Sequence, residues 1–289
     1  MRTEAVVPIR GYLLHLTHYD PVWVRRKGRE KPFDLSVGLE VVDGMADAGL
    51  NLLVIDCADG VKYRSHPELA RRYTVPMSHL RQLVRRAQKR GIEIVPKLNF
   101  AQSALHEHNH WFRPYHRLFD NDEYWRRAFR LIDELTAVCA PPRFFHIGMD
   151  EDHDRSHAQY AAAIRTLRDG LRERALRAVM WKDAQLYAAA QVHAEKSRAG
   201  EDKIPKDVVQ VVWHYGTVLT DVVRRLRQKG FEVWGAPGRE PEKVRAWREA
   251  ILRYGGTGLL LTHWIPCRPG NRTRLLRHIR TAGPVCSGG

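Results

Sequence analysis

A chain of 289 residues with 44% hydrophobic residues is long enough to bury a substantial core, which excludes a disordered protein. The formal net charge of +15 comes from arginines that recur along helical segments, so we interpret it as solvated helix faces. Attraction to an acidic partner is the alternative; the absence of a zinc-finger or RNP-like motif predicts no nucleic-acid partner.

Short apolar, β-branched runs alternate with longer stretches of helical period, and this alternation is typical of a parallel α/β fold. The predicted strands, in chain order, are Gly11–Leu16, Leu50–Ile55, Ile92–Pro96, Arg143–Ile147, Ala178–Trp181, Val208–Trp213, Phe231–Trp234 and Gly258–Thr262. The clearest predicted helices are Met77–Arg90, Asp122–Val138, Ser156–Arg174, Leu219–Lys229 and Pro241–Tyr254. The charged stretch Ala194–Lys206 is expected to be a surface loop, and the tail after Ala282 is expected to fray.

Eight strand–helix units predict a single (β/α)8 TIM barrel, one domain over residues 1–289 with a core at about 10–282. An open doubly wound sheet is the alternative, but its first turn usually carries phosphate-binding glycines. Here His15–Asp20 follows the first predicted strand without any glycine. We find no internal repeat and no linker in the sequence, which also favours one barrel.

Polar or aromatic residues follow every predicted strand, and the active site of this barrel fold lies at the strand ends. The residues at these ends include His18, Asp20, Trp23, Asp56, Asp59, Lys97, Asn99, Asp150, Glu151, Trp181, Asp183, Trp213, His214, Tyr215, Trp234, His263 and Trp264. A sugar ring has an apolar face that indoles cover and a rim of hydroxyls that carboxylates and imidazoles bind. Because tryptophans end four consecutive strands, we expect a carbohydrate pocket rather than ordinary core packing.

The adjacent carboxylates Asp150 and Glu151 follow the fourth predicted strand. Neighbouring carboxylates repel each other, so we expect one of them to hold a proton near neutral pH. A protonated carboxyl is what general acid catalysis at a glycosidic oxygen requires. Gly148, two residues before the pair, would let the backbone come close to a ligand.

At these residues the sequence resembles glycoside hydrolase family 20, the β-N-acetylhexosaminidases. His146–Glu151 reads H-I-G-M-D-E and resembles the family signature H-I-G-G-D-E, with Met149 in place of the second glycine. Three further segments resemble the family's S-x-P-E-L, R-G-I-x-V-I-P and W-x-D motifs in the same order, namely Ser65–Leu69, Arg90–Pro96 and Trp181–Asp183. The similarity covers residues 50–185 well and the rest loosely.

The resemblance implies a retaining, substrate-assisted glycosidase in which the 2-acetamido oxygen of the substrate attacks the anomeric carbon. Asp150 would orient the acetamido group, Glu151 would protonate the leaving oxygen and then activate water, and Tyr215 would bond the acetamido oxygen. The other candidates for substrate binding are His146, Trp181, Asp183, Trp213, Trp234, Trp264, Asp20 and Asp56. No metal or organic cofactor is implied, and the implied partner is an N-acetylhexosaminide, with an acidic or sulfated glycan suggested by the net charge.

Some positions differ from the family pattern. The family's arginine after the first strand has no counterpart, because Asp20–Trp23 stands there. The glutamate of the third-strand motif is Lys97, and the W-x-E of the eighth strand is Trp264–Pro266. These differences leave the sugar open and favour, as an alternative, a glycan-binding barrel without catalysis.

The histidine content favours a second alternative, a metal-dependent amidohydrolase-like enzyme. Amidohydrolase-like sites have H-x-H at the first strand and histidines on the fifth and sixth, whereas this chain has H-x-x-H (His15 and His18) at the first and Trp181 on the fifth. The histidine-rich segment His106–His110 is expected to be a solvated loop rather than a set of metal ligands.

Cysteine spacing and hydropathy bear on the cellular compartment. The four cysteines lack C-x-x-C spacing and indicate free thiols in a reducing compartment. No stretch approaches the roughly 20 apolar residues of a membrane span, and Met1–Arg10 has no apolar leader. We therefore expect a cytoplasmic protein without a membrane partner, or a secreted one if a leader was removed; no oligomeric state is predicted.

Overall fold

The computed structural model describes residues 6–18, 29–184 and 191–288, and these form a closed barrel of parallel strands in sequence order. The strands are β1 (Ile9–His15), β2 (Leu52–Asp56), β3 (Glu93–Lys97), β4 (Phe144–His146), β5 (Arg177–Lys182), β6 (Val209–Trp213), β7 (Val233–Ala236) and β8 (Gly258–Pro266). Pairing of β1 with both β2 and β8 closes the barrel. The predicted (β/α)8 barrel is confirmed.

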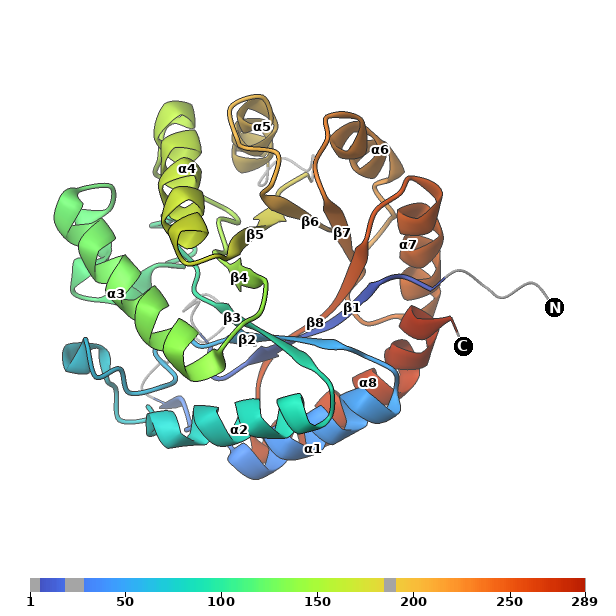
Figure 1. Ribbon diagram of the computed structural model, residues 1–289, viewed down its shortest axis with the longest axis horizontal. Helices are drawn as coiled ribbons and strands as arrows, with labels where there is room; N and C mark the ends of the chain where they lie inside the picture. Colours follow the sequence, from blue (N-terminus) through green and yellow to red (C-terminus); the bar gives the residue numbers. More distant parts are fainter. Residues whose placement is uncertain (1–5, 19–28, 185–190, 289) are drawn as a thin grey trace.

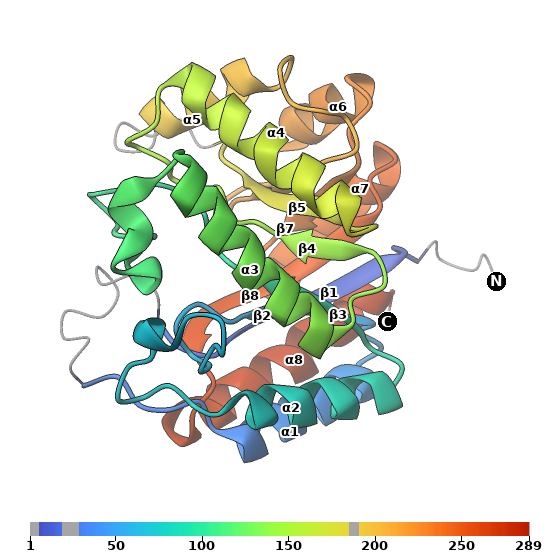
Figure 2. The same ribbon diagram turned by 60° about the vertical axis from the view of Figure 1, so that its left-hand side comes forward.

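Helices surround the barrel (Figure 1). They are α1 (Leu35–Asp47), α2 (Met77–Lys89), α3 (Asp122–Cys139), α4 (His157–Glu173), α5 (Gln191–Gly200), α6 (Thr220–Gln228), α7 (Pro241–Arg253) and α8 (Arg272–Ser287), with short 3-10 helices η2 (Pro67–Leu69), η3 (His110–Phe112), η4 (Tyr115–Leu118) and η5 (Pro269–Asn271). The first and last helices, α1 and α8, lie side by side beneath the barrel (Figure 2), which closes the ring of helices. None of the described helices is both long and apolar enough to span a membrane.

Alternating side chains of the strands fill two separate apolar cores. Leu13, Val54 and Val179 point into the barrel, whereas Leu14 and Ile55 point outward against the helices. This period of two is what a strand covered on both faces requires. The residues that end the strands therefore continue the same alternation, and every second one faces the mouth of the barrel.

Side-chain caps fix the first turn of two of the predicted helices, α3 and α4. The Asn121 side chain accepts a hydrogen bond from the Tyr124 N–H (2.9 Å) at the start of α3. Ser156 and Gln159 form a reciprocal capping box at the start of α4. Such caps satisfy backbone donors that have no partner within the helix, so they fix the first turn.

The prediction of a surface loop over residues 194–206 is wrong for its first part, which belongs to α5. Two of its charged side chains, Lys196 and Glu201, are buried in ion pairs, whereas the other charged side chains of the segment are exposed. Lys196 Nζ donates to the backbone carbonyl of Asp152 (2.6 Å), and Lys182 Nζ lies 3.1 Å from Glu201 Oε1 with both side chains 1% exposed. Charge without an apolar period misled the sequence analysis, because partners far away in the chain compensate these groups.

Two further expectations on element ends are corrected. Helix α8 continues to Ser287, whose hydroxyl donates to the carbonyl of Ala48 (3.1 Å), so the tail after Ala282 is packed rather than frayed. Strand β7 begins and ends two residues later than predicted. That shift places Trp234 near the start of the strand rather than at its end.

Candidate active site

The turn that follows β4 carries the two candidate catalytic carboxylates on a strained backbone. Gly148, Met149 and Glu151 have positive φ angles of 72°, 73° and 50°. Residues with a side chain rarely adopt this left-handed region, and such strain is concentrated at functional sites. Met149 thus keeps the conformation that glycine favours at the same position of the H-I-G-G-D-E signature, so this difference from the signature does not change the turn.

Asn99, two residues beyond β3, holds this turn and Asp150 together. Its Oδ1 accepts hydrogen bonds from the Ala101 and Met149 N–H groups (3.0 and 3.1 Å), which fixes the orientation of the amide. Its Nδ2 then donates to Asp150 Oδ1 (2.8 Å). Because Asp150 is only 6% exposed, this bond sets the direction of its carboxylate.

A third carboxyl, Asp183, completes the acidic cluster. The Glu151 N–H donates to Asp183 Oδ2 (2.9 Å), and Trp213 Nε1 donates to Asp183 Oδ1 (3.1 Å). Burial raises the pKa of Asp183 well above its usual range, and the nearby charge of Asp150 adds to the effect. Burial and repulsion from the neighbouring carboxylates thus disfavour a further negative charge in this cluster.

A layer of buried ionisable groups forms the floor of the mouth. His15, Asp56, Lys97 and His146 are neighbours in register across β1 to β4. Lys97 Nζ donates to Asp56 Oδ2 (2.6 Å), and His15 Nδ1 lies 3.1 Å from the same oxygen. Burial alone would raise the pKa of Asp56, but Lys97 and His15 lower it to about 2. Asp56 is therefore ionised, and its carboxylate is already paired with two buried side chains, Lys97 and His15.

His146 supports the turn after β4 from below. The Gly148 N–H donates to His146 Nδ1 (3.1 Å), so the ring carries its proton on Nε2. Burial lowers the pKa of His146 well below its usual range, which keeps the ring neutral. The ring centroid lies 4.7 Å from that of Trp181. His146 and Trp181 are 0% and 1% exposed, so both belong to the floor of the mouth.

Three partly exposed aromatic rings line the mouth above this floor. Trp264 lies 5.8 Å from Trp181 between ring centroids, and its Nε1 donates to the Tyr215 hydroxyl (2.5 Å). Trp213 lies 5.8 Å from Tyr215. Next to them is a cavity of about 450 Å³ lined by His18, Tyr215, Pro237, Gly238, Arg239, Glu240, Thr262, His263, Trp264, Ile265 and Arg274. Flat rings beside carboxylates are the arrangement expected for a sugar.

Two predicted substrate-binding residues need separate comment. Trp234 is fully buried, packs edge-on against Phe144, and donates through Nε1 to Thr257 Oγ1 (3.1 Å) just before β8. It fills the end of the barrel opposite to the mouth, so its expected place in the pocket is wrong. Asp20 lies outside the described residues.

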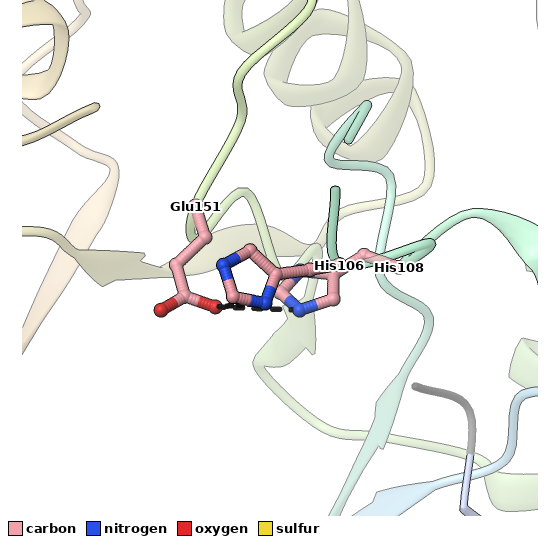
Figure 3. A group of neighbouring side chains, drawn as sticks. All are labelled: His106, His108 and Glu151. Atoms are coloured by element: carbon pink, nitrogen blue, oxygen red, sulfur yellow. Dashed lines mark ion pairs between the residues drawn. The ribbon is translucent and has the colours of Figure 1, made fainter. Parts of the chain in front are cut away.

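The prediction that the segment His106–His110 is a solvated loop is wrong for the buried part of the segment. His108 is 2% exposed, and its Nε2 lies 3.4 Å from Glu151 Oε2, while His106 Nδ1 lies 3.8 Å from the same oxygen (Figure 3). These three residues are the described group that could hold a metal ion. The H-x-H spacing at positions 106 and 108 was the available signal, but only the fold brings it to Glu151.

The sequence matches no protein-family model and no curated protein. Solved structures match it over nearly its whole length. The exo-β-N-acetylglucosaminidase of glycoside hydrolase family 20 from Vibrio harveyi, solved with N-acetylglucosamine, has a TM-score of 0.68 at 15% identity, over 97% of this chain and 54% of that one. The family 20 β-N-acetylhexosaminidase from Streptomyces coelicolor has a TM-score of 0.69 at 16% identity, over 96% and 64%.

Dispersin B has a TM-score of 0.63 at 13% identity, over 98% of this chain and 100% of that one. The chain thus spans about half the length of the Vibrio harveyi enzyme and the whole length of Dispersin B. At these identities the likeness establishes a shared fold. The TIM barrel predicted from the eight strand–helix units is therefore the fold that these family 20 structures share.

Proposed function

We propose that this chain is a glycoside hydrolase that removes terminal N-acetylhexosamine from glycans with retention of configuration. The observation that carries the proposal is the strained turn after β4, which presents Asp150 and Glu151 at the mouth of the barrel with Asp150 fixed by Asn99. The aromatic rings around this mouth support a sugar as the ligand. The fold shared with family 20 structures supports the reaction class.

In the proposed reaction the substrate supplies its own nucleophile. The 2-acetamido oxygen attacks the anomeric carbon while Glu151 donates its proton to the leaving glycosidic oxygen, and an oxazolinium intermediate forms. Asp150 orients the acetamido group and stabilises its developing positive charge. Glu151, now a carboxylate, takes a proton from the water that attacks the anomeric carbon, which opens the oxazolinium and regenerates the acid. Tyr215 is the proposed hydrogen-bond donor to the acetamido oxygen.

Two arginines in the cavity beside the site indicate which glycans we expect as substrates. Arg239 and Arg274 line the cavity beside Tyr215 and Trp264. Guanidinium groups are good partners for sulfate and carboxylate. We therefore propose that glycans with a sulfated or acidic residue are accepted, and that 6-sulfated substrates are worth testing beside neutral ones.

The first experiment is hydrolysis of aryl β-N-acetylglucosaminide and β-N-acetylgalactosaminide by wild type, Glu151→Gln and Asp150→Asn. Loss of a general acid typically costs a factor of about 10²–10⁴, and loss of a group that stabilises transition-state charge about 10²–10³, so Glu151→Gln and Asp150→Asn should each lose at least about 100-fold in kcat/KM. Glu173→Gln is the matched control, because that side chain is 80% exposed at the end of α4. NMR of the first product anomer checks retention.

A glycan-binding barrel without catalysis is the second candidate. The observation that favours it is Lys97, which replaces the glutamate of the third-strand motif and is buried against Asp56. Folded wild type that binds N-acetylhexosamine but hydrolyses neither neutral nor 6-sulfated substrates would support this candidate and contradict the proposed hydrolase.

A further inference from the structure

Two histidines from the loop after β3 meet the carboxylate of Glu151 at the mouth of the barrel (Figure 3). His106, His108 and Glu151 each offer one ligand atom, and the three atoms lie within 4.8 Å of one another. We propose that these side chains bind a divalent transition-metal ion of the Zn²⁺ type, which occupies Glu151 and inhibits hydrolysis. The inhibition rests on the proposed function, whereas the metal site does not.

The distances between the ligand atoms suit a tetrahedral ion. Zinc ligands lie about 2.0–2.2 Å from the ion, so two of them are about 3.3–3.6 Å apart in a tetrahedron. His108 Nε2 and Glu151 Oε2 are 3.4 Å apart, within this range. His106 Nδ1 and Glu151 Oε2 are 3.8 Å apart, and the whole set of ligand atoms lies within 4.8 Å, so the His106 ring must move inward by up to about 1 Å to complete the set. His106 is 25% exposed and has room for that movement.

His108 is held in the orientation that a metal ligand needs. Its Nδ1 lies 3.3 Å from the carbonyl oxygen of Asp150 and donates to it. The lone pair is therefore on Nε2, the atom that faces Glu151. A backbone carbonyl that fixes the tautomer and the ring in this way is typical of metal-binding histidines. The ring of His106 lies beside those of His108 (5.3 Å between centroids) and His153 (5.2 Å), so it already faces the other histidine of the proposed site.

The donor atoms select the class of metal. Two imidazole nitrogens with one carboxylate oxygen suit Zn²⁺, Co²⁺ and neighbouring transition metals, whereas Mg²⁺ and Ca²⁺ prefer oxygen ligands. Three protein ligands also leave the fourth tetrahedral position open to water. We therefore expect zinc and cobalt to bind and magnesium not to compete.

Metal binding and the proposed catalysis exclude each other at Glu151. An ion bound to Oε2 uses the lone pair that would carry the proton for the leaving oxygen. Its positive charge also disfavours protonation of the carboxyl. Added Zn²⁺ should therefore reduce hydrolysis, and a chelator should restore it.

The direct test is isothermal titration calorimetry of the chelator-treated full chain with ZnCl₂, which should show one ion bound per chain. Loss of an outer partner of a metal ligand costs about 10–100-fold in affinity, so His106→Ala and His108→Ala should each weaken binding by about 100-fold or more. His110→Ala is the matched control in the same loop, because His110 pairs with Glu107 rather than Glu151. Thermal melts show that each variant is folded.

The possible outcomes distinguish the existence of the metal site from its effect on hydrolysis. Absence of zinc binding by wild type, or equal weakening by His110→Ala and the two test variants, would overturn the site. Hydrolysis that is lost on chelation and restored by zinc would overturn the inhibition and favour a metal-dependent hydrolase. Zinc bound through His106 and His108 in a chain that hydrolyses no tested glycoside would support the site and count only against the proposed function.

Discussion

Replacing Gly148 by alanine tests how the turn after β4 positions the acidic pair. An added Cβ would lie 2.2 Å from Asn99 Oδ1 and 2.6 Å from Asn99 Cα. A side-chain rotation can relieve the first contact, but the second is with backbone, so the turn itself must move. Gly91 provides a matched control, because its φ of 71° is close to the 72° of Gly148 and an added Cβ there meets nothing within 4 Å.

The expected loss of stability separates into two parts. The left-handed conformation costs an alanine about 1–2 kcal/mol in both variants. Overpacking adds about 1–3 kcal/mol in Gly148→Ala alone. At about 2 °C per kcal/mol for a chain of this size, Gly148→Ala should melt about 2–6 °C below Gly91→Ala.

Thermal unfolding followed by circular dichroism, with both variants at one protein concentration, measures this difference. Hydrolysis gives a second readout, because a displacement of about 1 Å at a catalytic group can cost about 100-fold in rate. Gly91→Ala should keep the wild-type rate. Equal melting temperatures together with an undiminished rate in Gly148→Ala would refute the argument that Asn99 and Gly148 fix Asp150.

Two further predictions concern the floor and the walls of the mouth. Asp56→Asn leaves Lys97 buried without its carboxylate and should lower the free energy of unfolding near pH 7 by about 3–5 kcal/mol in urea. Because the pKa of Asp56 is about 2 in the fold against an ordinary 3.8, its contribution is present above about pH 5 and is lost as the pH falls toward 2. A difference between wild type and variant that stays constant in acid would contradict the ion pair. Trp264→Phe should raise KM about tenfold, because Trp264 lines the mouth. Trp234→Phe, in the buried core, should lower the melting temperature and leave KM unchanged. Kinetics and melts with the opposite pattern would place the sugar elsewhere.

The sequence by itself predicted the barrel and the position of its acidic pair, because both depend on local patterns. The apolar, β-branched runs, the stretches of helical period and the H-I-G-M-D-E segment all extend over a few neighbouring residues. Parallel strands end at one face of a barrel, so polar residues at those ends could be assigned to a common mouth.

The tertiary structure decided which of these side chains meet and which charges are buried. Asn99 reaches Asp150 across 51 positions of the chain, and His108 reaches Glu151 from the neighbouring loop. Strand β7 begins and ends two residues later than the sequence predicts. Trp234 therefore lies near the start of the strand and away from the mouth of the barrel. Lys196 can be buried because its ammonium group forms an ion pair with Asp152. In each case the partner is distant in the sequence, and the energy of a buried polar group depends on that partner rather than on its neighbours in the chain.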